Sequence, residues 1–122
     1  MKARVIYIGL ILIVIAIGYF LYDLAVNSKY RISAKDAKKQ KYDLILDVRT
    51  SLERQTLGYQ PDSVHIASAD LEKIMPSRYP DKSIKILVYC NTGHRARLAT
   101  DKLHLLGYKN SVYITEGYKS LL

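Results

Sequence analysis

Residues 5–22 form an uninterrupted apolar run, VIYIGLILIVIAIGYFLY, which contains no charged residue, no amide side chain and no proline. As an α-helix, these 18 residues cover about 27 Å, close to the roughly 30 Å thickness of the bilayer hydrocarbon. A helix buried in a protein core is the alternative, but a chain of 122 residues has room for only one small domain, which cannot surround such a helix. The run therefore predicts one transmembrane helix, an anchor at residues 1–27 that contacts membrane lipid through residues 5–22.

A cleaved signal peptide is the second alternative for this segment. The apolar region of a signal peptide spans about 7–15 residues and ends in small residues before the cleavage site. Here the run is longer, and the sequence that follows, Asp-Leu-Ala-Val-Asn-Ser, lacks a clean Ala-x-Ala site. A retained anchor is the favoured interpretation, and cleavage stays open as the alternative.

The positive charge of the chain is concentrated around the anchor. The net charge is +8, which in general raises nucleic acid or an anionic membrane as a partner. Residues 1–42 hold eight Lys or Arg against two Asp, whereas residues 43–122 hold eleven basic and nine acidic residues. A domain that binds nucleic acid more often carries its basic excess on the folded part, so no nucleic-acid partner is expected.

The distribution of basic residues also predicts the orientation of the anchor. Two basic residues precede the apolar run, and six follow it within about 20 residues: Lys29, Arg31, Lys35, Lys38, Lys39 and Lys41. The excess on the C-terminal side favours a single-pass protein of the cell membrane with its C-terminal domain in the cytoplasm. A single cysteine agrees with a reducing compartment and excludes an internal disulfide or a Cys-rich zinc site, and no metal site is expected.

After a short linker at residues 28–31, residues 32–122 show the alternation of strands and helices that is typical of a parallel α/β sheet. Buried strands are expected within residues 43–49, around the apolar run of residues 44–46, and at residues 85–89. Further strands are expected at residues 64–67 and 111–115. Helices are expected to begin at Ser33, to span residues 51–57 before Gly58, to span residues 69–75 until Pro76 ends them, and to span residues 95–106 before Gly107. Residues 76–83 have the composition of a loop, and residues 117–122 are expected to form one helical turn.

Cys90 lies at the point where a predicted buried strand gives way to a loop and then a helix. In parallel sheets, the carboxyl ends of the strands are the side on which ligands bind. The loop has three features that suit an anionic sulfur: backbone N–H groups that can converge, the positive end of the following helix, and the basic side chain of Arg95. Such surroundings favour the thiolate, which is the nucleophilic form. The residues proposed for the loop and for anion binding are Asn91, Thr92, Gly93, His94 and Arg95.

The alternative for Cys90 is a buried, inert cysteine at a strand end. The glycine and arginine within the next five residues argue against it, since Gly93 permits backbone conformations closed to other residues. Arg97 and His104 are expected to be solvated helix residues, although Arg97 could join Arg95 in attracting an anion. His65 is expected to be structural.

The segment from Ile32 to Leu121 resembles the rhodanese-like (sulfurtransferase) domain family. The similar motifs occur in the family's order: Ile32-Ser33 before a helix, Leu46-Asp47-Val48-Arg49 at a strand end, Gly58 with Pro61-Asp62-Ser63-Val64, the loop from Cys90 to Arg95, and Gly107-Tyr108 with Glu116-Gly117. The chain departs from the family's pattern at Tyr59-Gln60, Ala96, Glu116 and Leu121, and none of these residues is expected to contact the presumed nucleophile.

The resemblance implies a rhodanese-like parallel sheet flanked by helices, and a sulfurtransferase in which Cys90 carries a persulfide. A sulfane sulfur would pass from a donor such as thiosulfate to cyanide or a thiol, without a cofactor. Asp47 and Arg49 would organise the site from behind rather than react.

Two other function classes stay open at this point. A Cys-based phosphatase with a related sheet carries Cys-x5-Arg, whereas here Arg95 gives Cys-x4-Arg and residue 96 is alanine. A non-enzymatic sulfur carrier or interaction module at the membrane is the other alternative.

Overall fold

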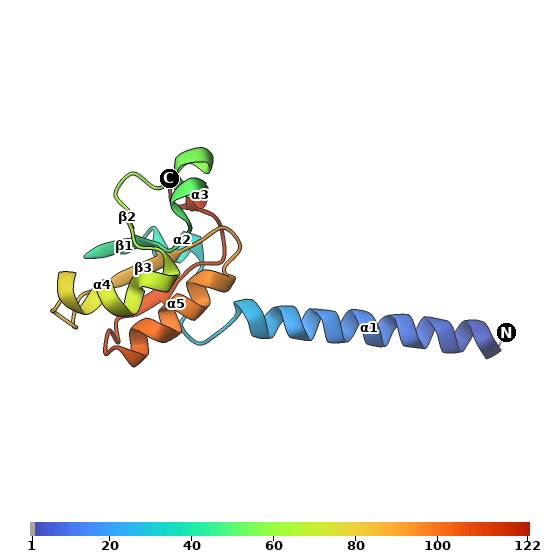
Figure 1. The fold of residues 1–122 in the computed structure, drawn as a ribbon. Helices are drawn as coiled ribbons and strands as arrows, with labels where there is room; N and C mark the ends of the chain where they lie inside the picture. The colour runs from blue at the N-terminus through green and yellow to red at the C-terminus, as the bar shows by residue number, and fades with distance from the viewer. Residues whose placement is uncertain (1) are drawn as a thin grey trace.

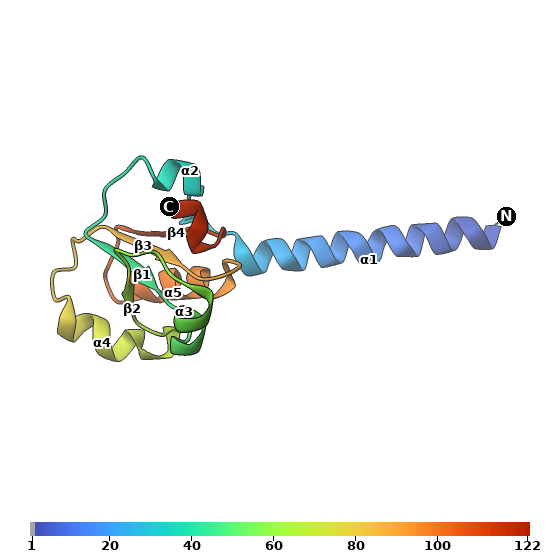
Figure 2. The same cartoon turned by 90° about the horizontal axis from the view of Figure 1, so that it is seen from above.

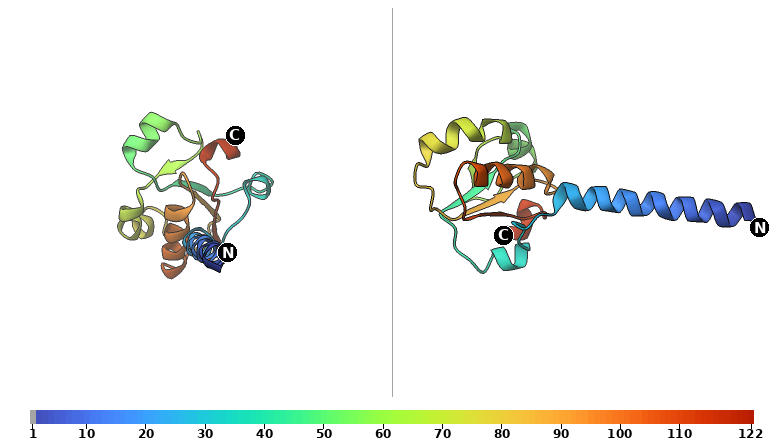
Figure 3. Two further views of the ribbon diagram at one scale, coloured as in Figure 1. Left: turned by 90° about the vertical axis from the view of Figure 1, so that its right-hand side faces the viewer. Right: turned by 90° about the horizontal axis from the view of Figure 1, so that it is seen from below.

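The computed structural model describes residues 2–122 as a long N-terminal helix joined to an α/β domain (Figure 1). Helix α1 (Lys2–Val26) is long and apolar enough to cross a membrane, and none of its most apolar stretch is buried in the protein. The helix extends away from the domain in Figures 1 and 2 and in the right-hand view of Figure 3. It starts before the apolar run and continues past Asp23 for a further three residues.

The domain is built on one parallel sheet in the order β2-β1-β3-β4. The strands are β1 (Leu44–Asp47), β2 (Val64–His65), β3 (Ile86–Tyr89) and β4 (Ser111–Tyr113). β1 and β3 lie in the centre of the sheet and are the most deeply buried strands, as their continuous apolar sequences predict. The predicted fold class, a parallel sheet flanked by helices, is confirmed.

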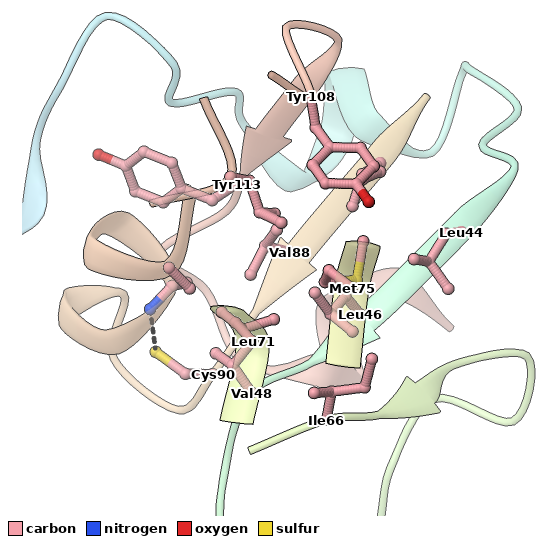
Figure 4. Packing of buried hydrophobic residues seen from close by; sticks show 14 residues of the cluster. Leu44, Leu46, Val48, Ile66, Leu71, Met75, Val88, Cys90, Tyr108 and Tyr113 are labelled. Atoms are coloured by element: carbon pink, nitrogen blue, oxygen red, sulfur yellow. Dashed lines mark hydrogen bonds between the residues drawn. The ribbon is translucent and has the colours of Figure 1, made fainter. Parts of the chain in front are cut away.

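Helices cover both faces of the sheet and divide the core into two clusters. α4 (Leu71–Arg78) and α5 (His94–Leu105) pack on one face, where side chains such as Leu46, Met75 and Leu103 fill the larger cluster (Figure 4). α2 (Ala34–Ala37) and the 3₁₀ turn η2 (Tyr118–Leu121) cover the other face. α3 (Ser51–Leu57) follows β1, and a second 3₁₀ turn, η1 (Ser68–Asp70), precedes α4.

The local signals in the sequence explain most element boundaries. Ser33 caps α2 through its side-chain oxygen, and Thr50 with Glu53 forms a capping box at the start of α3. Gly58 follows α3 with a φ of +84°, a left-handed conformation that glycine adopts without strain.

The predicted end of the helix at residues 69–75 is wrong. Pro76 was expected to end its helix, but α4 runs on to Arg78 with Pro76 inside it. Proline has no backbone N–H, so the carbonyl of Glu72 lacks the hydrogen bond that it would accept from residue 76 in a regular helix. Glu72 is exposed, so water can solvate that carbonyl, and the helix continues. The strands β2 and β4 are also shorter than predicted, and α5 begins one residue earlier, at His94.

Candidate active site

Cys90 follows β3 directly, and its side chain is buried, with 2% of the residue exposed. Its Sγ accepts hydrogen bonds from the backbone N–H of Gly93, at 3.1 Å, and from that of Ala96, at 3.4 Å. The bond from Ala96 is drawn as the dashed line at Cys90 in Figure 4. Two backbone amides therefore point at the sulfur, which is the arrangement that stabilises a thiolate or a persulfide anion.

Gly93 allows the loop to bring these amides together. Its φ is +98°, a left-handed conformation in which an L side chain is strained. A Cβ at this position would lie only 2.7–2.8 Å from atoms of Thr115, including its Cα. The glycine is thus required by both backbone conformation and space, and α5 begins at the next residue, with its positive end beside the loop.

Behind the loop lies a buried ion pair between Asp47, at the end of β1, and Arg49. The Arg49 guanidinium donates to both carboxylate oxygens of Asp47 at 2.9 Å, and the backbone N–H of Arg49 donates to one of them at 3.0 Å. Arg54 and the Tyr89 hydroxyl donate to the same carboxylate at 3.1 and 3.2 Å. Burial alone raises the pKa of Asp47, but the hydrogen bonds from Arg49 and Arg54 outweigh burial and hold that pKa below its ordinary value.

Arg49 links this pair to the loop. Its Nη1 donates to the side-chain oxygen of Asn91 at 3.2 Å, and Nη2 donates to the carbonyl of Gly58 at 2.7 Å. Asn91 in turn donates from Nδ2 to Glu53 at 2.6 Å. Arg49 therefore contacts the loop through Asn91 and Asp47 holds Arg49, while the hydrogen bonds to Cys90 Sγ come from Gly93 and Ala96. This arrangement suits an organising role for the predicted residues Asp47 and Arg49.

Arg95 does not present a free positive charge, in contrast to the expectation from its place in the loop. Its two terminal nitrogens donate to both carboxylate oxygens of Glu53, at 2.6 and 2.7 Å. The hydrogen bonds from Arg95 and from Thr50 hold the pKa of Glu53 well below its ordinary value. The predicted loop residue Arg95 thus fixes the loop to α3, and its charge is compensated.

Of the remaining predicted loop residues, Thr92 and His94 are exposed. Arg97 lies 3.9 Å from Asp101, one turn further along α5. His65 contacts the carbonyl of Arg49 at 2.6 Å and is structural, as expected. Among the described residues, no group of three or more His, Cys, Asp and Glu is placed to hold a metal ion.

The sequence reasoning missed two residues of the site. Ala96 was expected not to contact the nucleophile, but its backbone N–H donates to Cys90 Sγ. Glu53 is the other. The sequence Thr50-x-x-Glu53 signals a capping box at the start of a helix, and the structure contains that box. The same carboxylate also binds Asn91 and Arg95, which lie about forty residues further along the chain. No local pattern could have predicted this second role.

A surface hollow of about 320 Å³ adjoins the loop between Asn91 and η2, with Arg49 and Gly117 on its walls. A larger hollow, of about 530 Å³, lies away from Cys90 between Tyr30 and the C-terminal half of α5. We take the smaller one as the candidate substrate site, because Asn91 is the neighbour of the cysteine in the chain.

The charges of this network predict a pH dependence of stability. The folded-state pKa values of Asp47 and Glu53 are lowered, so each pair stabilises the fold fully above the ordinary values of 3.8 and 4.5. That stabilisation is lost as the pH falls through the lowered values. We expect the free energy of unfolding, measured with urea on the full chain in detergent, to decline below these values. Glu53→Gln should make this decline shallower. If the free energy of unfolding depends on pH in the same way in this variant, the pair between Glu53 and Arg95 does not contribute to stability as proposed.

Comparisons with known proteins agree with this geometry. The sequence matches the family model described as "Rhodanese-like domain" over residues 32–121. A rhodanese-related protein from Thermoplasma volcanium has 29% identity and a TM-score of 0.63, with 75% of this chain and 88% of that chain covered. No curated protein matches the sequence.

Two further solved structures share the fold. The human single-domain sulfurtransferase TSTD1 has 19% identity and a TM-score of 0.63, with 76% of this chain and 95% of that chain covered. A thiosulfate sulfurtransferase from Pseudomonas aeruginosa has 22% identity and a TM-score of 0.61, with 73% of this chain but only 18% of that chain covered. Since the family model covers nearly all of the chain after α1, and Cys90 follows the central strand of the same parallel sheet, the chain belongs to the rhodanese-like domain family.

Proposed function

We propose that the protein is a membrane-anchored sulfurtransferase that moves a sulfane sulfur from thiosulfate or a similar donor to cyanide or a thiol through a Cys90 persulfide. The observation that carries the proposal is the pair of backbone amides, from Gly93 and Ala96, that converge on Cys90 Sγ. Membership of the rhodanese-like family and the fold shared with sulfurtransferases support it.

In the first step, the Cys90 thiolate attacks the outer sulfur of thiosulfate. A new S–S bond forms on Cys90, and the old S–S bond breaks as sulfite leaves with its electron pair. In the resulting persulfide, the two amides face the inner sulfur, Sγ, and the negative charge lies on the outer sulfur, beside the loop and the positive end of α5. In the second step, cyanide or a thiolate attacks the outer sulfur, and the Cys90 thiolate leaves. The cycle needs no external oxidant, and the second substrate comes from outside the chain because Cys90 is its single cysteine.

The size of the loop favours sulfur over phosphate chemistry. Arg95 lies five positions after Cys90, one fewer than in a Cys-x5-Arg phosphatase loop, and its guanidinium is held by Glu53. A phosphatase needs an arginine free to bind the phosphoryl oxygens. The non-enzymatic carrier differs from the proposed enzyme only in turnover, which the assay below measures.

The same proposal assigns α1 to the cell membrane and the domain to the cytoplasm. The length and apolar composition of α1 support the anchor, and the six basic residues that follow the apolar run support the orientation. The lipid partner is the bilayer around residues 5–22, and small sulfur compounds are the substrates.

The ion pair between Glu53 and Arg95 predicts a change in donor affinity. In Glu53→Gln, the guanidinium keeps its charge but loses its carboxylate partner, so the positive potential beside Cys90 increases. We expect the KM for thiosulfate to fall by about two- to fivefold, the size expected for a partly exposed charge pair. Glu72→Gln, which removes an exposed carboxylate near Lys102 on α4 and α5, is the matched control and should leave KM unchanged. An equal KM in both variants would show that Glu53 does not limit the attraction of the donor by Arg95.

The test of the proposed function is turnover by the purified full chain in detergent. Thiosulfate with cyanide should give thiocyanate, and this activity should be lost in Cys90→Ser. An aryl phosphate should not be hydrolysed. Hydrolysis of the phosphate ester without thiocyanate formation would overturn the sulfurtransferase proposal, and persulfide formation without turnover would support the carrier instead.

A further inference from the structure

The active-site loop lies at the end of the domain from which α1 departs. The strands are parallel, so their carboxyl ends lie along one edge of the sheet, and Cys90 follows one of them. Figures 1 and 2 show that this edge is the one next to α1, with the start of α5 beside the C-terminal end of α1. If α1 spans a membrane, the edge with Cys90 therefore faces that membrane.

The connection between α1 and the domain is short and held in place. Val26, the last residue of α1, is 5% exposed, and its carbonyl accepts a hydrogen bond of 2.6 Å from the buried Tyr113 hydroxyl. The backbone of Tyr113 also bonds to Tyr30 at 3.1 Å and to Ile32 at 2.9 Å, so residues 30–32 run along β4. The segment between helix and sheet therefore has little freedom to turn the domain away from the membrane.

The distance between the apolar run and the domain is also small. The run ends at Tyr22, and four further helical residues, about 6 Å of rise, lead to Val26. The headgroup layer on each side of a bilayer is about 5–8 Å thick. The carboxyl edge of the sheet is thus expected at the level of the lipid headgroups.

The side chains at this edge suit such a surface. Residues 90–97 include two arginines and no acidic residue, and Thr92 and His94 are exposed. Leu52, in the first turn of α3, is 69% exposed although it is apolar. Two carboxylates lie near the loop: Glu53 is paired with Arg95, and Glu116 follows β4, between Thr115 and Gly117. The two arginines balance these two carboxylates, so the edge carries no net negative charge that would repel an anionic phospholipid surface.

We infer that the bilayer surface covers the carboxyl edge of the sheet and thereby limits access to Cys90 to sulfur donors and acceptors of low molecular weight. The inference rests on the anchoring role proposed for α1, and it adds that the membrane is part of the site's specificity. A soluble protein carrying a thiol cannot bring that thiol to Cys90 without displacing the domain from the headgroups, whereas thiosulfate, cyanide and small thiols are small enough to reach Cys90 without such a displacement.

The placement is tested with a spin label on the full chain in nanodiscs of phosphatidylcholine and phosphatidylglycerol that contain a nickel-chelating lipid. In a Cys90→Ser background, the label is attached to Thr92→Cys in the loop or to Leu105→Cys at the far end of α5. Both positions are exposed, which makes them a matched pair. We expect nickel on the headgroups to enhance relaxation of the label at position 92 and to have no such effect at position 105.

The limit on access is tested on Cys90 itself, with a small maleimide and the same maleimide attached to a polyethylene glycol chain. A second variant carries a flexible Gly/Ser insert of about twelve residues between Tyr22 and Asp23, with a mean span of about 20 Å, which leaves the contacts of Val26 intact. Both chains are placed in nanodiscs. We expect the bulky reagent to modify Cys90 in the insert variant but not in the natural chain. The small reagent should modify Cys90 equally in both chains.

The outcomes separate this inference from the proposed function. A chain that does not incorporate into nanodiscs contradicts the anchor and this inference together. An incorporated chain with equal relaxation at positions 92 and 105, or with equal reaction of the bulky reagent in both variants, overturns this inference alone. Neither readout depends on sulfur transfer, which the thiocyanate assay measures separately.

Discussion

Replacing Arg49 with methionine is expected to lower the free energy of unfolding by about 3 kcal/mol, because it leaves the carboxylate of Asp47 buried without its main partner. Both side chains are almost completely buried. Arg54 and Tyr89 remain as partners of Asp47, which places the expected loss at the lower end of the range for a broken buried pair. The measurement is urea unfolding of the full chain in detergent, followed by circular dichroism.

The matched control for this prediction is Lys39→Met. Lys39 pairs with Asp36 on the surface, where the two side chains are 65% and 61% exposed, and such pairs contribute about 0–1 kcal/mol. A second check is the double variant Asp47→Leu with Arg49→Met, which removes both charges and should recover part of the lost stability. A loss at Arg49 no larger than that at Lys39 would show that the buried pair does not stabilise the fold.

Replacing Gly93 with alanine is expected to lower the rate of persulfide formation by on the order of a hundredfold, because the amides of the loop move away from Sγ. The left-handed φ costs an alanine about 1–2 kcal/mol. The contact of its Cβ with the backbone of Thr115, at 2.8 Å, forces the loop to shift further. Two hydrogen bonds to an anionic sulfur are weakened together, which explains the size of the effect.

The variant Gly107→Ala separates the effect of the left-handed φ from the effect of the close contact with Thr115. Gly107 has nearly the same φ, +100°, but a Cβ there would meet only the flexible side chain of Lys82, at 3.7 Å or more. We expect this control to lose about 1–2 kcal/mol of stability and to form the persulfide at the normal rate. Each variant is allowed to react with thiosulfate, the reaction is quenched after short times, and the amounts of persulfide formed are compared. A normal rate in Gly93→Ala would contradict the role of the loop amides.

The sequence was sufficient to predict those features that depend on neighbouring residues. The apolar runs of β1 and β3, the cap at Ser33 and the stop at Gly58 all act within a few residues, and each led to an element that the structure contains. Pro76 also acts locally, but whether it ends a helix depends on solvent access to the carbonyl of Glu72, and that access is a property of the folded surface.

The contacts that hold the loop could not be predicted in the same way. Arg95 and Glu53 are 42 residues apart, and the sequence contains nothing that marks Glu53 as a partner for Arg95 rather than as a capping residue alone. The position of Cys90 at a strand end could be predicted, whereas the pairing of the nearby Arg95 charge with Glu53 could not. The place of α1 relative to the loop also follows only from the direction of the strands in the folded sheet.

The central claim is that Cys90 accepts a sulfur atom and holds it as a persulfide. The most direct measurement is the intact mass of the full chain after exposure to thiosulfate, with Cys90→Ser treated in parallel. The account predicts a gain of one sulfur atom in the natural chain, removed again by cyanide, and no gain in the variant. An unchanged mass in the natural chain, or the same gain in Cys90→Ser, would contradict it.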